Sequence, residues 1–394
     1  MRSGKSCQGF THQDRGTTRL FNETWNWLTV RAFTAFVEAR LARVRRQGKS
    51  VLGDFRVAER IAWSPLTFQA VLSARDLGLL AALERAGQAG LLPAEAAAQA
   101  GLSLYATRVL LEACMIVEVT ELVGKRYRLA SAGFILVNDR VTRANMDFVQ
   151  DVCYQGAFHL KETLQQGQPA GLKVFGPWKT IYEGLTQLPE KVQQSWFGFD
   201  HAYSSAAFPD ALPIVFSGRP KRLLDVGGNT GKWALSCVTH DPEVQVCILD
   251  HPGQLELARK TLAAARSIGR VEFTPMDLLD HSLAFPEEHD AVWMSQFLDC
   301  FNEGDITRLL ERGRKALSTG GTLYIMETFW DRQPHDVARD VVVASSIYFA
   351  CMATGDSRMY HSDDLRACLE SAGLKLTCEH QLNLHTLWAC QARG

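Results

Sequence analysis

A glycine-rich turn between an apolar strand and a helix is the first group of residues that could do chemistry. The segment over residues 223–231 reads Leu-Leu-Asp-Val-Gly-Gly-Asn-Thr-Gly, and the next predicted strand ends in Asp250. Glycine has no Cβ and tolerates a positive φ, so a ligand can approach the backbone of such a turn. A carboxylate at the tip of the neighbouring strand is placed to accept both ribose hydroxyls of a nucleoside. The pattern therefore predicts a nucleoside cofactor.

The same turn departs from two phosphate-binding motifs. A dinucleotide fingerprint needs the spacing G-x-G-x-x-G, which neither Gly227 nor Gly228 begins. A phosphate loop needs serine or threonine after its lysine, but Trp233 follows Lys232. A turn without a phosphate cradle suits an adenosine ligand that carries no phosphate.

Strands alternate with helices after residue 222, and this order must position the turn. The alternation predicts a mainly parallel sheet with helices on both faces. The predicted strands are residues 223–226, 244–249, 271–274, 291–294 and 322–327, with a final pair near 374–380 and 384–391. An uncharged run over residues 341–355 is shorter than the roughly 20 residues that a membrane span needs, and we interpret it as a buried helix.

Residues 67–135 predict a winged-helix unit, with helices at 93–100 and 103–116 and a hairpin that turns at Gly124. Winged helices often bind DNA. A groove-reading element needs cationic side chains toward phosphate, yet the stretch between Leu102 and Gly124 has one arginine, Arg108, against three glutamates. We therefore expect an apolar dimerising role and no nucleic-acid partner.

Composition indicates an ordinary globular protein of two or more units. The chain has 394 residues, of which 46% are hydrophobic and 22% charged, with a net charge of −1. Its ten cysteines include no CxxC pair, so no metal site is expected. The polar start lacks an apolar segment of the kind that signal peptides carry, and we expect a cytoplasmic protein without membrane insertion. Residues 21–46 predict an amphipathic arm that packs on another subunit, with a membrane-surface helix as the alternative.

Residues 146–215 predict helices that are rich in aromatic side chains. Most of these side chains are expected in the core, and some could form the wall of a pocket for a flat substrate. The aromatic residues are Phe148, Tyr154, Phe158, Trp178, Tyr182, Trp196, Phe197, Phe199 and Tyr203.

Taken in order, the motifs resemble a known family: the caffeate-type S-adenosylmethionine-dependent O-methyltransferases of small molecules, from plant and bacterial secondary metabolism. The resemblance covers about residues 60–392. It implies an α/β fold, with a winged-helix dimerisation domain and arm over residues 1–145 and a Rossmann-like class I methyltransferase domain over residues 146–394. The motifs that carry it are the turn from Asp225 to Gly231, Asp250 with the following His-Pro, Met276-Asp277, residues 290–317 and Glu327.

The resemblance implies S-adenosyl-L-methionine as the cofactor and assigns residues to it by position. The turn glycines would border its methionine and sugar, Asp250 would bind the ribose, and Asp277 with Leu278 would hold the adenine. Ser295 stands where the family keeps a lysine near the adenine. The cofactor-binding residues expected on this basis are Asp225, Gly227, Gly228, Gly231, Asp250, Asp277, Leu278 and Ser295.

The catalytic segment departs from the family pattern. The family removes the acceptor's proton with a histidine, but Asp299 occupies that position, and Cys300 replaces the acid that follows. Glu327 matches a glutamate that orients the histidine, whereas the second such glutamate falls at Ser362, next to His361.

Several roles for these residues remain open. Phenols have pKa values near 10 and aspartate near 3.9, but burial beside Glu327 could raise one of the two carboxyl pKa values. Asp299 is then a base for an acidic aromatic hydroxyl, or it holds a phenol while a ring carbon attacks. Alternatively, His361 supplies the base, or it has only a surface or capping role. Asp299 could also simply cap the helix over residues 302–317.

We therefore predict a homodimeric methyltransferase that moves the methyl group of S-adenosyl-L-methionine to a hydroxyl of a small aromatic metabolite. The alternatives are methylation of a carbon on a phenolic ring, and a cofactor-binding protein that no longer transfers methyl groups.

Overall fold

The computed structural model describes residues 51–393 of the chain. These residues separate into two units, with the division between Val137 and Asn138. The sequence predicts the division near residue 145, inside helix α7 (Arg140–Phe148). The arm predicted over residues 21–46 lies outside the described residues.

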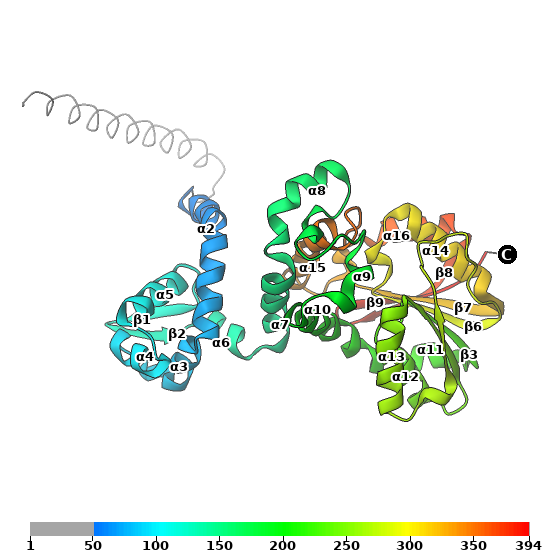
Figure 1. The fold of residues 1–394 in the computed structure, drawn as a ribbon, viewed down its shortest axis with the longest axis horizontal. Coiled ribbons are helices and arrows are strands. Elements are labelled where there is room, and N and C mark those ends of the chain that lie inside the picture. Colours follow the sequence, from blue (N-terminus) through cyan, green and yellow to red (C-terminus); the bar gives the residue numbers. More distant parts are fainter. Residues whose placement is uncertain (1–50, 394) are drawn as a thin grey trace, which may run out of the picture. The chain divides into compact units, whose positions relative to one another are not determined.

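The N-terminal unit is a group of helices that carries a two-stranded hairpin (Figure 1). This succession confirms the predicted winged-helix-like domain. Its elements are α2 (Val51–Asp76), α3 (Leu79–Ala86), α4 (Pro93–Ala100), α5 (Leu104–Ile116), β1 (Thr120–Val123), β2 (Arg126–Leu129) and α6 (Ser131–Asn138).

Local signals in the sequence set the ends of these elements. The Ser103 hydroxyl accepts a hydrogen bond from the Ala106 amide at 3.1 Å, which satisfies one of the amides that the first turn of α5 leaves unpaired. The hairpin turns at Gly124, whose φ of 64° is a conformation that glycine adopts at little cost. The fully buried leucines of this unit are Leu79, Leu80, Leu83 and Leu111.

Within residues 51–393, no single helix is long and apolar enough to cross a bilayer. The bent pair Leu52–Asp76 and Leu79–Ala89 passes that test only when the two helices are taken together. The uncharged run over residues 341–355 lies in helix α15 (Asp336–Tyr348) and the wider helical turn Phe349–Ala353, and the side chains of that turn are mostly buried.

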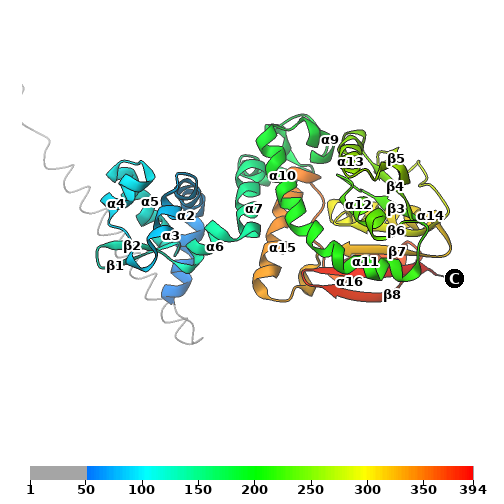
Figure 2. The same ribbon diagram turned by 90° about the horizontal axis from the view of Figure 1, so that it is seen from below.

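A seven-stranded sheet forms the centre of the C-terminal unit, in the order β5-β4-β3-β6-β7-β9-β8 (Figure 2). Strands β5 to β7 pair in parallel, while β9 runs antiparallel to β7 and β8. The mainly parallel sheet confirms the prediction. The strands are β3 (Arg222–Val226), β4 (Gln245–Asp250), β5 (Val271–Pro275), β6 (His289–Ser295), β7 (Leu317–Glu327), β8 (Leu374–Leu382) and β9 (His385–Ala392).

Helices cover both faces of the sheet, and an apolar core lies on each face (Figure 1). Leu309 of α14 and Leu369 of α16 belong to one core, whereas Val238 of α12 and Leu255 of α13 belong to the other. Strands covered on both faces read as continuous apolar runs, as β4 does. The longer helices of the unit are α7, α8 (Leu160–Gln166), α10 (Glu190–Tyr203), α11 (Phe208–Val215), α12 (Lys232–His240), α13 (Pro252–Ala264), α14 (Glu303–Ala316), α15 and α16 (Ser362–Ser371).

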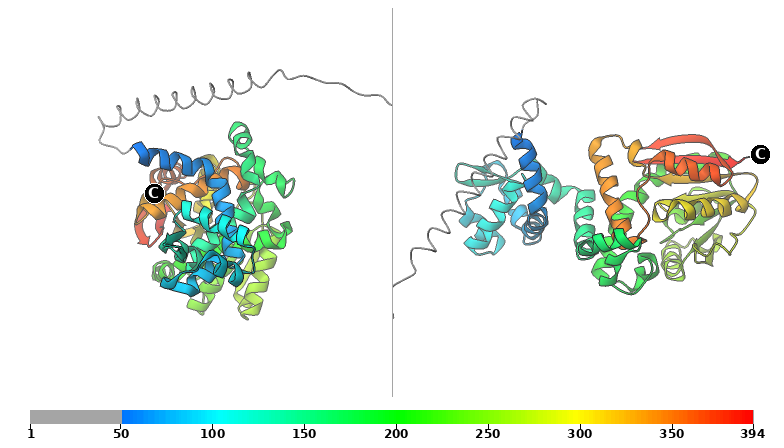
Figure 3. Two further views of the ribbon diagram at one scale, coloured as in Figure 1. Left: turned by 90° about the vertical axis from the view of Figure 1, so that its left-hand side faces the viewer. Right: turned by 90° about the horizontal axis from the view of Figure 1, so that it is seen from above.

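A third apolar cluster lies among α7, α10 and α15, which stand at one end of the sheet (Figure 3). Its buried side chains include Phe148, Trp196 and Tyr348. Strand order reverses between β3 and β6, because the chain leaves β3 for β4 and β5 on one side and then continues to β6 and β7 on the other. Loops that leave such a point diverge and open a crevice at the carboxyl ends of the strands.

Candidate active site

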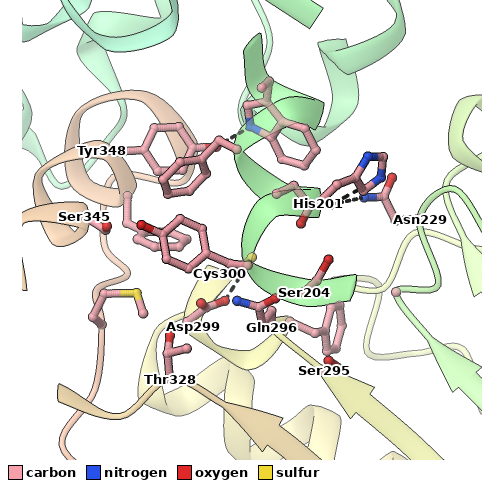
Figure 4. A pocket seen from close by; sticks show the side chains of 18 of the residues that line it. His201, Ser204, Asn229, Ser295, Gln296, Asp299, Cys300, Thr328, Ser345 and Tyr348 are labelled. Atoms are coloured by element: carbon pink, nitrogen blue, oxygen red, sulfur yellow. Dashed lines mark hydrogen bonds and ion pairs between the residues drawn. The ribbon is translucent and has the colours of Figure 1, made fainter. Parts of the chain in front are cut away.

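A cavity of about 620 Å³ lies in the C-terminal unit, among the loops after β3 to β6 and the helices α7, α10 and α15 (Figure 4). This size is ordinary for a small-molecule site. Gly231, Glu327 and His361 do not line it. The other predicted site residues do: Asp225, Gly227, Gly228, Asp250, Asp277, Leu278, Ser295 and Asp299.

Gly227 and Gly228 line the cavity, but neighbouring side chains fill the space where their side chains would be. A Cβ on Gly227 would clash with the Phe297 ring, and one on Gly228 would lie 2.6 Å from Ile248. Gly227 also has a φ of 74°, which a residue with a Cβ rarely adopts. The sequence predicts that these glycines let a ligand approach the backbone. In the structure, the absence of their side chains also gives space to the side chains of Phe297 and Ile248.

The last glycine of the turn has a structural place. Gly231 has a φ of 74° and precedes α12, and a Cβ there would lie 3.0 Å from Ala258 of α13. It does not line the cavity, although its neighbours Thr230 and Lys232 do, so its place beside the cofactor stays a prediction. It lets α12 begin close to α13.

Two buried carboxyls meet at the ends of β3 and β4. Asp250 accepts hydrogen bonds from the Asn229 amide at 2.8 Å and from the His251 amide at 2.7 Å. Oδ2 of Asp225 is buried without a hydrogen-bond partner among residues 51–393. Burial and the nearby Asp250 raise the pKa of Asp225 to about 8, so Asp225 is largely protonated at neutral pH and can donate a hydrogen bond.

The residues predicted at the adenine lie along the loops after β5 and β6. Asp277 accepts a hydrogen bond from the Leu279 amide at 3.0 Å, and Leu278 is held through its carbonyl by Arg312 at 2.6 Å. Ser295 Oγ is buried and has no hydrogen-bond partner in the described part of the chain. All three predicted residues line the cavity.

Asp299 lies on a short helical turn after β6 and faces the cavity beside Cys300 (Figure 4). The Cys300 thiol donates to Asp299 Oδ1 at 3.4 Å, and the Tyr182 hydroxyl donates to the Cys300 sulfur at 2.9 Å. Burial raises the pKa of Asp299 to about 6. The carboxyl is therefore ionised at neutral pH, yet it is a stronger base than an exposed aspartate.

Glu327 lies behind this turn, outside the cavity lining. Its Oε1 accepts hydrogen bonds from the amides of Phe297 at 3.0 Å and Leu298 at 2.9 Å. Burial and the charge of Asp299 hold the pKa of Glu327 well above its usual range. Glu327 thus fixes the backbone that carries Asp299 without lining the cavity.

Two helix caps bear on the alternatives that the sequence left open, and one of them contradicts the capping role of Asp299. Asn302, and not Asp299, caps α14, because Asn302 Oδ1 accepts a hydrogen bond from the Asp305 amide at 2.9 Å. The imidazole of His361 caps α16 by accepting from the Asp363 amide at 3.1 Å. The capping role predicted for His361 is confirmed. His361 does not line the cavity, and its alternative role as a catalytic base stays a prediction.

Some of the aromatic residues do form a wall. Trp196 donates its indole N–H to the Tyr348 hydroxyl at 2.8 Å, and the Phe148 and Phe199 rings stack with centroids 4.0 Å apart. Phe158, by contrast, is 82% exposed. The aromatic residues that line the cavity are Phe148, Tyr182, Trp196, Phe199, Tyr203, Phe208, Trp233, Trp293, Phe297, Phe301, Tyr348 and Phe349.

Sequence reasoning missed a group of polar residues on α10, in the glycine turn and at the start of α12. Asp200, His201, Asn229 and Lys232 all line the cavity. Burial lowers the pKa of His201 to about 4, so this imidazole is neutral. The sequence signal that could have indicated this group is the adjacent pair Asp200-His201 within the aromatic-rich helix α10. Among residues 51–393, no cluster of His, Cys, Asp and Glu is placed to hold a metal ion.

Comparisons with known proteins agree with this architecture. Residues 159–375 match the O-methyltransferase domain, and residues 55–127 match the Dimerisation2-like domain. L-tyrosine C(3)-methyltransferase of Streptomyces lavendulae is 26% identical over 324 residues, which are 80% of this chain and 86% of that protein.

Two further matches come from sequence and structure. 3-Hydroxy-5-methyl-1-naphthoate 3-O-methyltransferase of Streptomyces sahachiroi is 28% identical over 265 residues, 67% of this chain and 74% of that protein. Human N-acetylserotonin methyltransferase, solved with SAM, has a TM-score of 0.63 at 17% identity and covers 88% of this chain and 99% of its own. The structural match shows the class I methyltransferase fold. Because the O-methyltransferase profile spans more than half of the sequence, this chain belongs to the O-methyltransferase domain family.

Proposed function

We propose that this chain transfers a methyl group from S-adenosyl-L-methionine to a hydroxyl of a small aromatic acceptor. The observation that carries the proposal is that one cavity joins the glycine turn and Asp250 to an aromatic wall and the buried carboxyl of Asp299. A nucleoside cofactor and a flat acceptor could therefore occupy adjoining parts of the same space.

The residues present fit the cofactor. Buried polar groups normally have hydrogen-bond partners, yet Asp225 Oδ2, Asn229 Oδ1 and Ser295 Oγ have none among the described residues. Such atoms suit a polar ligand. Asp250 would bind the ribose hydroxyls, and Asp277 would accept from the adenine amine beside Leu278.

The chain's own residues would then activate the acceptor. The cofactor supplies a methyl group on a positively charged sulfur. Asp299 would accept the acceptor's hydroxyl proton, because a base with a pKa near 6 is available at neutral pH. Glu327 would position Asp299 through the two amides it binds, and the aromatic wall would exclude water and orient the ring.

Calorimetric titration with S-adenosylhomocysteine tests the cofactor, and transfer of labelled methyl groups to candidate phenols tests the reaction. We expect wild-type binding and its loss in Asp250→Ala, with Asp210→Ala on the exposed start of α11 as the control. Absence of wild-type binding would refute the proposal. Binding without transfer to any acceptor would instead support a protein that has lost the reaction.

A second candidate is methylation of a ring carbon. It is favoured by the similarity to L-tyrosine C(3)-methyltransferase over most of the chain and by an aspartate, Asp299, in the base position. A carboxylate that holds a phenol would activate the carbon next to the hydroxyl. NMR spectroscopy of the product separates an aryl methyl from a methoxy group.

We further propose that the N-terminal unit makes a homodimer. The Dimerisation2-like match covers it, and its helix α2 exposes Ile61, Trp63 and Leu66, each more than half accessible. Apolar side chains gathered on one helix are typical of an interaction surface. A cytoplasmic location remains a prediction.

A further inference from the structure

A short chain of hydrogen bonds leads from α9 (Ile181–Gly184) to the carboxyl of Asp299. The Tyr182 hydroxyl donates to the Cys300 sulfur at 2.9 Å, and the Cys300 thiol donates to Asp299 Oδ1 at 3.4 Å. Figure 4 shows the side chains of Cys300 and Asp299 directed toward each other, and all three residues line the cavity. The thiol is therefore the middle member of the chain, an acceptor on one side and a donor on the other.

Both donors of this chain keep their protons at neutral pH. Burial and the charge of Asp299 raise the pKa of the Cys300 thiol well above its usual range, and burial raises the pKa of the Tyr182 hydroxyl in the same way. Asp299, with a pKa of about 6, is ionised at neutral pH, so its carboxylate can only accept. The chain therefore runs in one direction, from the phenol hydroxyl through the thiol to the carboxylate.

Tyr182 is held both at its backbone and at its ring. Its carbonyl accepts a hydrogen bond from the side-chain amide of Gln254 at 3.0 Å, and Gln254 is buried in the first turn of α13. Its ring meets the ring of Trp196 edge-on, with centroids 6.4 Å apart. A side chain that is already fixed loses little further freedom when it forms a hydrogen bond. Tyr182 can therefore keep the Cys300 thiol in one orientation.

The thiol acts against the effect of burial on Asp299. Desolvation raises the pKa of this carboxyl, whereas the hydrogen bond that Cys300 donates to the charged form lowers it. Without the thiol, the pKa would be higher, and a smaller fraction of the carboxyl would be ionised at neutral pH. A thiol is only a weak donor, so it offsets burial in part. The result is a base whose pKa lies close to neutral pH, where general bases are most effective.

We propose that Tyr182 and Cys300 are positioning residues, which orient the Asp299 carboxylate toward the acceptor's hydroxyl and keep it ionised. Neither residue takes part in a covalent step. The acceptor's proton moves to Asp299, while the thiol and the phenol hydroxyl keep their own protons. This inference rests on the proposed methyltransferase function for the role of Asp299, but the hydrogen-bond chain itself can be tested without any acceptor.

Infrared spectroscopy of the S–H stretching band tests the chain in the full-length protein. The band of Cys300 is isolated by subtracting the spectrum of Cys300→Ser or Cys300→Ala from that of the protein that keeps the thiol. Its frequency falls as the thiol donates more strongly, so we expect it to fall as the pH rises through about 6 and Asp299 ionises. Asp299→Asn removes this dependence on pH. Cys378→Ser, at an exposed cysteine of β8, leaves the Cys300 band unchanged.

The shift of the band must be assigned to Asp299 and not to another group that titrates nearby. Asp200 of α10 has a pKa of about 7 and ionises in a similar range. Asp200→Asn is therefore measured as well, and it should keep the pH-dependent shift that Asp299→Asn removes. The titratable groups whose charges interact with Asp299 are Tyr182 of α9, Asp200 of α10, Cys300 beside it, Glu327 at the end of β7 and Tyr360 before α16.

The pH dependence of methyl transfer tests the consequence for the reaction. In Cys300→Ala the carboxylate loses its donor, so the rise of kcat/KM that is expected near pH 6 moves up by about one pH unit. Cys300→Ser keeps a donor, so the rise stays at the wild-type pH or below it. Tyr182→Phe leaves the thiol without its hydroxyl partner and moves the rise upward by a smaller amount. Tyr105→Phe, at a side chain that is 79% exposed, keeps the wild-type profile.

The outcomes separate this inference from the proposed function. If the Cys300 band does not move with pH in the wild type, or moves equally in Asp299→Asn, the hydrogen-bond chain is refuted whatever the activity. If the band moves but Cys300→Ala keeps the wild-type pH profile, the positioning role is refuted while the function stands. If the band moves and no acceptor is methylated, the methyltransferase function fails, and the positioning role with it. Melting curves that match the wild type confirm that the variants are folded.

Discussion

At the scale of single residues, burial raises the pKa values of several carboxyls that line the cavity. Asp299 occupies the position of the histidine in the related family, and its pKa of about 6 is close to that of an ordinary histidine. Desolvation disfavours the charged carboxylate and so makes it a better base. We therefore expect Asp299 to act as the base at the pH at which an imidazole would.

Asp299→Asn removes this base but keeps the shape of the side chain. We expect the rate of methyl transfer to fall at least about 100-fold, the lower end of what general bases contribute, while S-adenosylhomocysteine affinity changes less than twofold. In the wild type, kcat/KM should rise as the pH increases through about 6 and then level off, because the base must be ionised. Initial rates measured across this range check both statements.

A matched control uses Asp277→Asn, which should weaken cofactor binding more than it slows the saturated reaction. If Asp299→Asn keeps the wild-type rate and pH profile, Asp299 is not the base. The neutral imidazole of His201 would then be the next residue to examine, since it lines the same cavity.

At the scale of elements, the end of β7 holds the turn after β6. The carboxyl oxygen of Glu327 that accepts from the Phe297 and Leu298 amides is buried with them. Without this acceptor, two buried N–H groups would have no partner, and each such loss costs about 1–3 kcal/mol. The position of Asp299 therefore depends on a residue in another strand.

Glu327→Ala should lower the free energy of unfolding by about 2–4 kcal/mol and reduce methyl transfer. Glu327→Gln keeps a carbonyl oxygen as the acceptor, so its stability should lie within about 1 kcal/mol of wild type. Urea unfolding measures both values. If Glu327→Ala and Glu327→Gln lower the free energy of unfolding equally, the hydrogen bonds to the Phe297 and Leu298 amides do not hold the turn.

The cap of α14 gives a second test at this scale. Asn302→Ala should cost about 1 kcal/mol, the usual value of an N-cap, because Asn302 Oδ1 binds the Asp305 amide. Asp299→Ala should cost no cap energy, because Asp299 accepts no amide of α14. If urea unfolding shows the loss of free energy for the Asp299 variant and not for the Asn302 variant, Asp299 is the capping residue.

At the scale of the whole molecule, the buried carboxyls make stability depend on pH. The pKa of Asp225 is raised to about 8 and that of Asp200 to about 7, against about 3.9 in the unfolded chain. The folded chain therefore keeps protons that the unfolded chain has released. The stability that these groups contribute at low pH is lost as the pH rises through their folded pKa values.

We expect the melting temperature to fall as the pH rises from about 6.5 to about 8.5, a range above the ordinary histidine pKa. Buried histidines with lowered pKa values, such as His385, make stability increase with pH. They do so only at pH values below that range, where histidines of the unfolded chain are protonated. In Asp225→Asn the fall should be smaller. Calorimetry measures the melting temperatures of the wild type and of Asp225→Asn across this pH range. An equal fall in both proteins would contradict the raised pKa of Asp225.

The dimer gives a further prediction for the whole molecule. Sedimentation should show two chains per particle, and Leu66→Asp should shift it toward one, because the exposed apolar side chain would carry a charge into the interface. Glu59→Gln, at an exposed position of α2, serves as the control. Cofactor binding should persist, since the cavity is lined by residues of the C-terminal unit. A wild-type monomer would refute the dimer.

Much of this architecture could be predicted because its determinants are local. Apolar runs bounded by turns gave the order of strands and helices, and the short spacing between the glycine turn and Asp250 placed both at neighbouring strand ends. The sequence, by contrast, left open whether Asp299 caps the helix that follows it, and the structure gives that cap to Asn302. The short helical turn Leu298–Cys300 separates Asp299 from α14, and no pattern of residue types revealed that turn.

The sequence by itself determined the family, the sheet and the strands that carry Asp225 and Asp250. Only the tertiary structure decided which side chains share the cavity, because residues such as Asp200 and Lys232 are separated along the chain and both line it through packing. It also decided that Glu327 acts from behind the turn and that His361 caps a helix. The same packing raises the carboxyl pKa values, since desolvation depends on everything that surrounds a group and not on its neighbours in sequence.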